Sequence, residues 1–221
     1  MKKIKKLYAF FVIIAIPIFV FTAALNITFR APEVYSYYFN ESQAIDYTTL
    51  ALTSNQLADQ IAGFANDFFG DEVEIVENAG YQDDPVFNDE EAEILFELRS
   101  ILSKTLLLML IALAVGIPSY VLLVRREEEK LLFFSCQIGI AISTVVTIIS
   151  GIMFRLSRFR AMLYQNYVDI SLPKDSVLKI LFTKGNFWGT CDIVYVAMAI
   201  IILLAVLYVS WRLTKPYKIF K

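Results

Sequence analysis

Long apolar runs without a charged side chain set the pattern of this sequence. Four of them, each at least 19 residues long, contain no Asp, Glu, Lys or Arg: 7–25, 105–124, 131–154 and 193–211. A helix of about 20 apolar residues crosses the ~30 Å hydrocarbon core of a bilayer and satisfies its own backbone groups there. The composition agrees, since 57% of the residues are hydrophobic, against about 45–50% in soluble domains. The pattern predicts an all-α membrane protein with four transmembrane helices.

The basic residues predict how the chain is oriented. With four spans, the segments 1–6, 125–130 and 212–221 lie on one side of the membrane, and they hold 11 of the 20 Lys and Arg residues in very little chain. Short segments rich in Lys and Arg face the cytoplasm. We therefore expect a multi-pass protein of the cell membrane with both termini cytoplasmic, and with the segments 26–104 and 155–192 outside.

A second interpretation of the first apolar run is a cleaved signal peptide. Thr22-Ala23-Ala24 would supply the small-residue cleavage site, and three spans would remain. The run of 19 residues is longer than the usual apolar region of a signal peptide, which has about 7–15 residues. Its length favours a membrane span.

The two outer segments carry opposite charge. Residues 26–104 hold 16 acidic residues against two arginines and one lysine, whereas residues 155–192 hold six basic and three acidic residues. Each run alone is typical of a solvated surface. Together they predict an acidic extracellular cap that folds over a basic segment near the lipid headgroups.

Local patterns predict that the cap is folded and mostly helical. Thr53 followed by Gln56 matches a capping box, and the apolar residues after it recur at helical spacing: Leu57, Ile61, Phe64 and Phe68. The segments 72–77 and 81–87 around Asn78-Ala79-Gly80 predict a short β-hairpin.

A second helix of the cap is expected to begin at Asn88 with Glu91, where the spacing again fits an N-terminal cap. Its apolar face would consist of Ile94, Leu98, Ile101 and Leu102. No helix-breaking residue separates it from the run 105–124, so one helix can continue from the cap into the membrane.

The sequence pattern of the second outer segment predicts helices at the membrane interface. Phe159, Leu163 and Tyr167 recur at every fourth residue, as on an amphipathic helix. A further helix is expected over Pro173–Phe182, and Trp188 marks the headgroup level. Aromatic residues of both outer segments either anchor the protein or line a cavity that is open to lipid.

The sequence excludes several classes of chemistry. It has no histidine, which rules out Ser–His and Cys–His catalysis and histidine metal sites. It contains no phosphate-binding loop and no nucleotide fingerprint, and the spacing of its acidic residues fits no calcium loop. We expect no metal, no cofactor and no nucleic acid. The four apolar runs contain no charged residue, which disfavours a coupled transporter.

Several stretches resemble a family of Gram-positive integral membrane proteins that includes the lipoprotein intramolecular transacylase. The similarity covers nearly the whole chain, from its four spans to the order of its two outer segments. The stretches that carry it are Tyr35–Phe39, Asn55–Phe69, Phe87–Lys104 with Glu97-Leu98-Arg99, and Phe159–Pro173 with Asn166.

The resemblance implies transfer of an acyl chain to the α-amino group of a lipoprotein's N-terminal cysteine. That chemistry needs a base for an amine of pKa about 8 and donors for an oxyanion. The family uses two histidines, and this sequence places Ile94 and Arg160 at those positions. Arg160 is suited to stabilise an oxyanion but not to act as a base. Glu93 or Glu97 would have to replace the base, which requires a buried carboxylate tuned by its surroundings.

Three hypotheses follow. The first is a relative without the histidine-dependent activity that binds membrane lipids or diacylated lipoproteins at the cap. The second is an acyltransferase that uses Glu93 or Glu97 as base and Arg160 as electrostatic partner. The third is an accessory subunit whose acidic cap binds a basic extracellular partner. The predicted binding residues are Phe96, Arg99, Phe159, Tyr164, Asn166 and Trp188.

Overall fold

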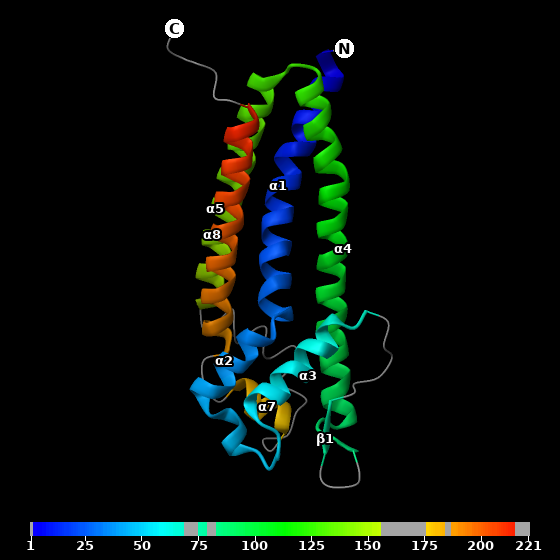
Figure 1. Cartoon of the computed structure of the whole chain (residues 1–221), viewed down its shortest axis with the longest axis vertical. Coiled ribbons are helices and arrows are strands. Elements are labelled where there is room, and N and C mark those ends of the chain that lie inside the picture. Colours follow the sequence, from blue (N-terminus) through cyan, green and yellow to red (C-terminus); the bar gives the residue numbers. More distant parts are fainter. Residues whose placement is uncertain (1, 69–74, 79–82, 156–175, 184–186, 215–221) are drawn as a thin grey trace. The chain divides into compact units, whose positions relative to one another are not determined.

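Four long apolar helices dominate the computed structural model, which describes residues 2–68, 75–78, 83–155, 176–183 and 187–214 (Figure 1). Each is long and apolar enough to cross a membrane. They are α1 (Lys2–Arg30), α4 (Asp89–Arg125), α5 (Glu129–Arg155) and α8 (Phe187–Thr214). The predicted class of an all-α, multi-pass membrane protein is confirmed. All four helices extend beyond the apolar runs that predicted them, and α4 continues from the cap into the second run, as expected.

The chain divides into two compact units. The first, which we call the bundle unit, comprises Met1–Leu25, Lys104–Ser150 and Val196–Lys221. The second, which we call the cap unit, comprises Asn26–Ser103 and Gly151–Tyr195. Both outer segments of the sequence therefore contribute to the cap unit.

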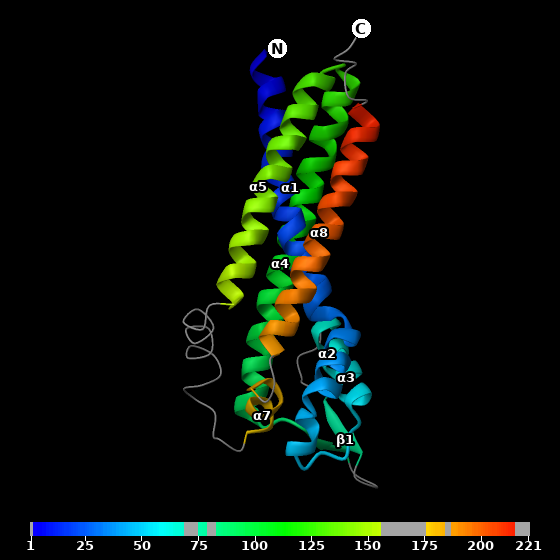
Figure 2. The ribbon, with the colours of Figure 1, turned by 90° about the vertical axis from the view of Figure 1, so that its left-hand side faces the viewer.

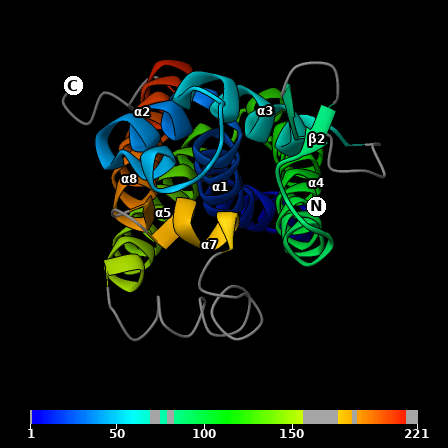
Figure 3. The ribbon, with the colours of Figure 1, turned by 90° about the horizontal axis from the view of Figure 1, so that it is seen from below.

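Within the bundle unit, α1 packs closely against both α4 and α5 (Figure 3). A Cβ atom added to Gly116 of α4 would lie 2.8 Å from the Cβ of Ala15. A Cβ atom added to Gly139 of α5 would lie 3.0 Å from the Cδ1 of Ile16. Glycine at both positions thus allows the backbones to approach closely, which is how helices gain packing contacts in lipid.

The N-terminal end of α1 lies beside the turn between α4 and α5 (Figure 2). Lys5 forms an ion pair with Glu128. The guanidinium of Arg126 lies over the ring of Tyr8, with its Cζ 5.4 Å from the ring centroid. These contacts join two of the three basic segments at one end of the bundle unit.

The cap unit begins with three short helices: α2 (Pro32–Ser42), the 3₁₀ helix η1 (Ala44–Tyr47) and α3 (Ser54–Asn66). The predicted capping box of α3 is confirmed, because the Thr53 and Gln56 side chains each accept a hydrogen bond from the other's backbone N–H. Leu57, Ile61 and Phe64 are buried, as the spacing indicated. Phe68 differs, since it follows the end of α3 and is 48% exposed.

The predicted hairpin is present but shorter than the sequence pattern indicated. Strand β1 (Val76–Asn78) pairs antiparallel with β2 (Asp83–Pro85), and Val76 lies opposite Pro85. Helix α4 begins where Asn88 and Glu91 predicted. On its predicted face, Ile94 is buried but Ile101 is 41% exposed.

The second outer segment contributes α7 (Val177–Thr183) and the start of α8 to the cap unit. The described part of the predicted helix Pro173–Phe182 is helical from Val177 onward, and Pro173 lies outside the described residues. The amphipathic repeat that begins at Phe159 and the basic residues of 156–175 also lie outside the described residues. The predicted charge complementarity between the two outer segments therefore stays a prediction.

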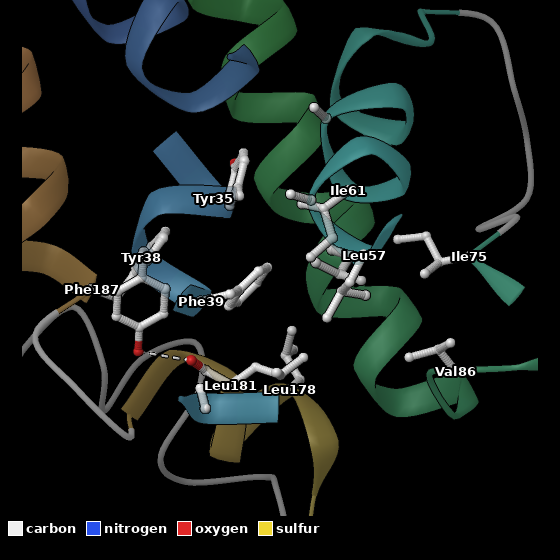
Figure 4. Close-up of a cluster of buried hydrophobic side chains, with 14 of the residues drawn as sticks. Tyr35, Tyr38, Phe39, Leu57, Ile61, Ile75, Val86, Leu178, Leu181 and Phe187 are labelled. Atoms are coloured by element: carbon white, nitrogen blue, oxygen red, sulfur yellow. Dashed lines mark hydrogen bonds between the residues drawn. The ribbon is translucent and has the colours of Figure 1, made fainter. Parts of the chain in front are cut away.

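A single apolar core joins both outer segments (Figure 4). Leu178 and Leu181 of α7 are buried in the same cluster as residues of α2, α3 and α4. The Tyr38 hydroxyl donates a hydrogen bond of 2.8 Å to the carbonyl oxygen of Leu181. In the described residues the two outer segments therefore meet through apolar packing and hydrogen bonds.

Candidate functional site

The carboxylate of Glu91 connects the first turns of two helices. Its side chain is 1% exposed and accepts hydrogen bonds from the backbone N–H of Asn88 and of Leu178, each at 3.0 Å, and from the Ser176 hydroxyl. Asn88 returns a bond from its side chain to the Glu91 N–H, at 2.9 Å. Helix N-termini favour negative charge. Glu91 thus caps α4 and fixes α7 against it.

Arg99 of α4 is held on two aromatic rings. Its guanidinium carbon lies 4.6 Å from the ring centroids of both Phe64 and Phe96, and these rings contact each other edge to face. The side chain is 11% exposed, and its Nη1 lies 3.9 Å from a carboxylate oxygen of Asp67. The predicted binding residues Phe96 and Arg99 are therefore in direct contact.

Arg30, the last residue of α1, lies at the same end of α3. Its Nε donates to the side-chain oxygen of Asn26 at 2.9 Å, and its Nη1 donates to the carbonyl oxygen of Ala65. Its guanidinium carbon is 4.6 Å from the ring centroid of Phe68. The amide of Asn66 donates in turn to the Arg30 carbonyl oxygen, at 3.1 Å.

The first turns of α8 bury polar side chains. Asp192 and Tyr195 are each 2% exposed. The predicted binding residue Trp188 lies one turn before Asp192 and contacts the ring of Phe29, with centroids 6.2 Å apart. The sequence pattern placed Asp192 just outside the last span, but α8 begins at Phe187 and includes it. Asp192 directly precedes the apolar run 193–211 and belongs to the part of α8 that lies in the cap unit.

Tyr35 of α2 packs among these residues. Its hydroxyl donates a hydrogen bond of 2.9 Å to the carbonyl oxygen of Phe29. Burial raises the pKa of Tyr35 well above its ordinary value; nearby Cys191 adds to the shift and Arg30 opposes it. Tyr35 therefore stays protonated at neutral pH and acts as a donor.

Of the predicted catalytic residues, only Glu93 and Glu97 belong to the described part of the chain, where they lie one turn apart on α4. Glu93 and Glu97 are both exposed on α4, so they lack the burial that a tuned base requires. Arg160 lies outside the described residues, as do Phe159, Tyr164 and Asn166. No group of three potential metal ligands occurs among the residues that were described.

Two buried acidic residues were missed by sequence reasoning. Glu91 was recognised only as a local cap, and its spacing to Asn88 carried no signal for its contact with α7. Asp192 borders an apolar run and could have been found by extending the helix to the aromatic residues that precede it.

Known proteins similar to this chain were found by structure and not by sequence. No family model matches the sequence, and no curated protein matches it. The solved structure of the membrane integral lipoprotein intramolecular transacylase Lit from Bacillus cereus matches with a TM-score of 0.76, over 100% of both chains and at 10% identity. The chain has the fold of Lit. At this identity the likeness establishes the fold alone.

Two variants of the B. cereus Lit match as well. One carries a histidine-to-arginine change and matches at a TM-score of 0.72 and 11% identity, over 97% of this chain and 93% of that one. The other carries a histidine-to-alanine change and matches at 0.72 and 10%, over 99% and 97%. Both variants replace the same histidine, so the Lit fold persists in that protein without it.

Proposed function

We propose that this protein binds diacylated lipoproteins or membrane lipids through its cap and does not carry out histidine-dependent acyl transfer. One observation carries the proposal: the chain has the fold of Lit over its full length and contains no histidine. The two Lit variants support it, because in that protein the fold does not depend on the replaced histidine.

The carboxylates of the cap support the same proposal. A replacement base would have to be buried and still available to an amine. Glu93 and Glu97 are exposed, and Glu91 is buried but already accepts three hydrogen bonds. None of these three side chains meets both conditions.

The proposal predicts binding without transfer. In a host that lacks other N-acylating enzymes, a reporter lipoprotein produced with this protein should keep a free α-amino group on its diacylglyceryl cysteine. Mass spectrometry of its N-terminal peptide measures this, with B. cereus Lit as the positive control. The purified protein should bind a diacylated lipopeptide about tenfold or more tightly than the same peptide without lipid, a difference of about 1.4 kcal/mol.

Two results would contradict this proposal in different ways. An acyl chain on the cysteine amine would support the acyltransferase hypothesis, and the double variant Glu93→Gln/Glu97→Gln would then test its base. Equal affinity for the lipidated and unlipidated peptides would refute lipid recognition. If the remaining binding also weakened strongly with salt, it would favour docking of a basic partner by the acidic cap.

We also propose that both termini are cytoplasmic and that the cap is extracellular. The dense basic segments support this orientation. The ion pair between Lys5 and Glu128 fits two of these segments being on the same side of the membrane. Tyr37 is 60% exposed in the cap unit and Glu127 is exposed in the α4–α5 turn. A membrane-impermeant maleimide should label Tyr37→Cys in intact cells, and Glu127→Cys only after permeabilisation. The reverse order of labelling would overturn the orientation.

A further inference from the structure

We propose that Arg30 and Arg99 form a binding site for the phosphodiester of an anionic membrane lipid, at the C-terminal end of α3. The site does not recognise a lipoprotein; it deepens the binding of membrane lipids proposed above by naming a lipid class, and rests on that part of the proposal. Lipid binding without a preference for the anionic headgroup would overturn this site alone.

The first observation is the convergence of positive charge in an acidic segment. Residues 26–104 contain only two arginines against 16 acidic residues. Both arginines contact the same short stretch of chain, at the end of α3. Arg30 donates to the carbonyl oxygen of Ala65. Arg99 stacks on Phe64 and faces Asp67 at 3.9 Å.

The second observation is the way in which each guanidinium is held. The guanidinium carbon of Arg30 lies 4.6 Å from the ring centroid of Phe68, and that of Arg99 lies 4.6 Å from those of both Phe64 and Phe96. These rings restrict where each guanidinium lies, and its planar fork of N–H groups matches the oxygens of a phosphate. The Nη2 of Arg30 is buried and has no hydrogen-bond partner among the residues that the structure describes. An acceptor at this nitrogen would satisfy it, and a phosphate oxygen reaches it once the half-exposed Phe68 side chain moves aside.

The third observation is position. Arg30 is the last residue of α1, and Arg99 precedes the apolar run 105–124 by six residues. Both therefore lie where a membrane span ends, at the level of lipid phosphates. The neighbouring side chains reach the surface, since Phe68 is 48% exposed and the Asp67 side chain 50%. This position favours a lipid over a soluble anion.

Substitutions of Arg99 and of Asp67 should change the affinity for an anionic lipid in opposite directions. The Asp67 carboxylate faces Arg99 and would compete with a phosphate for the guanidinium. Arg99→Gln should weaken binding of an anionic lipid, whereas Asp67→Asn should strengthen it. If Arg99 served only to pack and cap the end of α3, removal of the Asp67 charge would not increase lipid affinity.

The experiment is native mass spectrometry of the delipidated full chain, titrated with phosphatidylglycerol or with phosphatidylcholine of the same acyl chains. We expect about a tenfold preference for phosphatidylglycerol, and a loss of about five- to tenfold in Arg30→Gln and in Arg99→Gln. Asp67→Asn should raise the affinity about two- to fivefold. Arg126→Gln is the matched control, because Arg126 also lies over an aromatic ring but belongs to the bundle unit.

Thermal unfolding of each variant establishes that it is folded. If an arginine variant does not fold, Asp67→Asn still tests the site. Equal binding of the two lipids would overturn the proposal. So would a preference that survives both arginine substitutions, or one that Arg126→Gln abolishes to the same extent. Displacement of phosphatidylglycerol by millimolar inorganic phosphate would assign the site to a soluble anion and refute the lipid.

Discussion

Replacing Glu91 by alanine is expected to lower the free energy of unfolding of the cap unit by roughly 3–5 kcal/mol. The substitution removes the acceptor of three hydrogen bonds at a side chain that is 1% exposed. The backbone N–H groups of Asn88 and Leu178 would remain beside the gap without this acceptor. A buried donor left without a partner costs about 1–3 kcal/mol, and bonds to a carboxylate are stronger than neutral ones.

The measurement is thermal unfolding in detergent, combined with hydrogen exchange of the α7 amides. Exchange at Leu178 should accelerate most, because its N–H bonds directly to Glu91. Glu93→Ala is the matched control: it removes the same group from the same helix at an exposed position, and should change stability by less than about 0.5 kcal/mol. Equal effects of the two substitutions would contradict the role assigned to Glu91.

The sequence predicted those parts of this structure that depend on local periodicity and on helix ends. Apolar runs located the four long helices, and the pairs Thr53 with Gln56 and Asn88 with Glu91 located the starts of α3 and α4. These features involve residues three or four positions apart, so spacing alone specifies them. The fold class could therefore be predicted without a structure.

Contacts between distant segments could not be predicted in the same way. The distance along the chain from Glu91 to Ser176 is 85 residues, and no spacing rule relates them. The same holds for Arg30 and Arg99, which lie far apart in the sequence but both contact the end of α3. Phe68 continued the apolar spacing of α3 but lies beyond its last turn, where it supports Arg30 instead of entering the core. The candidate site depends on such contacts, so most of it required the structure.

Gly116→Ala should destabilise the bundle unit by about 1–3 kcal/mol, although alanine normally favours a helix over glycine by up to about 1 kcal/mol. The new Cβ would lie 2.8 Å from the Cβ of Ala15, so α1 and α4 would have to separate. In lipid, close packing is a main source of helix association, and the loss of contact has little hydrophobic compensation.

Gly63→Ala is the control, and it should change the stability in the opposite direction. Gly63 lies inside α3, and a Cβ atom there would meet nothing within 4 Å. Gly63→Ala should therefore raise stability by about 0.5–1 kcal/mol. Thermal unfolding in detergent compares the two. A rise in stability for Gly116→Ala would show that the contact with α1 does not limit helix packing.

A second substitution tests whether α1 is the partner. Ala15→Gly removes the atom that the new Cβ meets, so Gly116→Ala combined with Ala15→Gly should recover part of the loss. Because Ala15 and Ile16 make the close contacts to α4 and α5, cleavage of the chain after Ala24 would remove the helix on which both pack. Retention of the first helix as a membrane span stays a prediction of the sequence, and the paired substitutions test the packing on which it would depend.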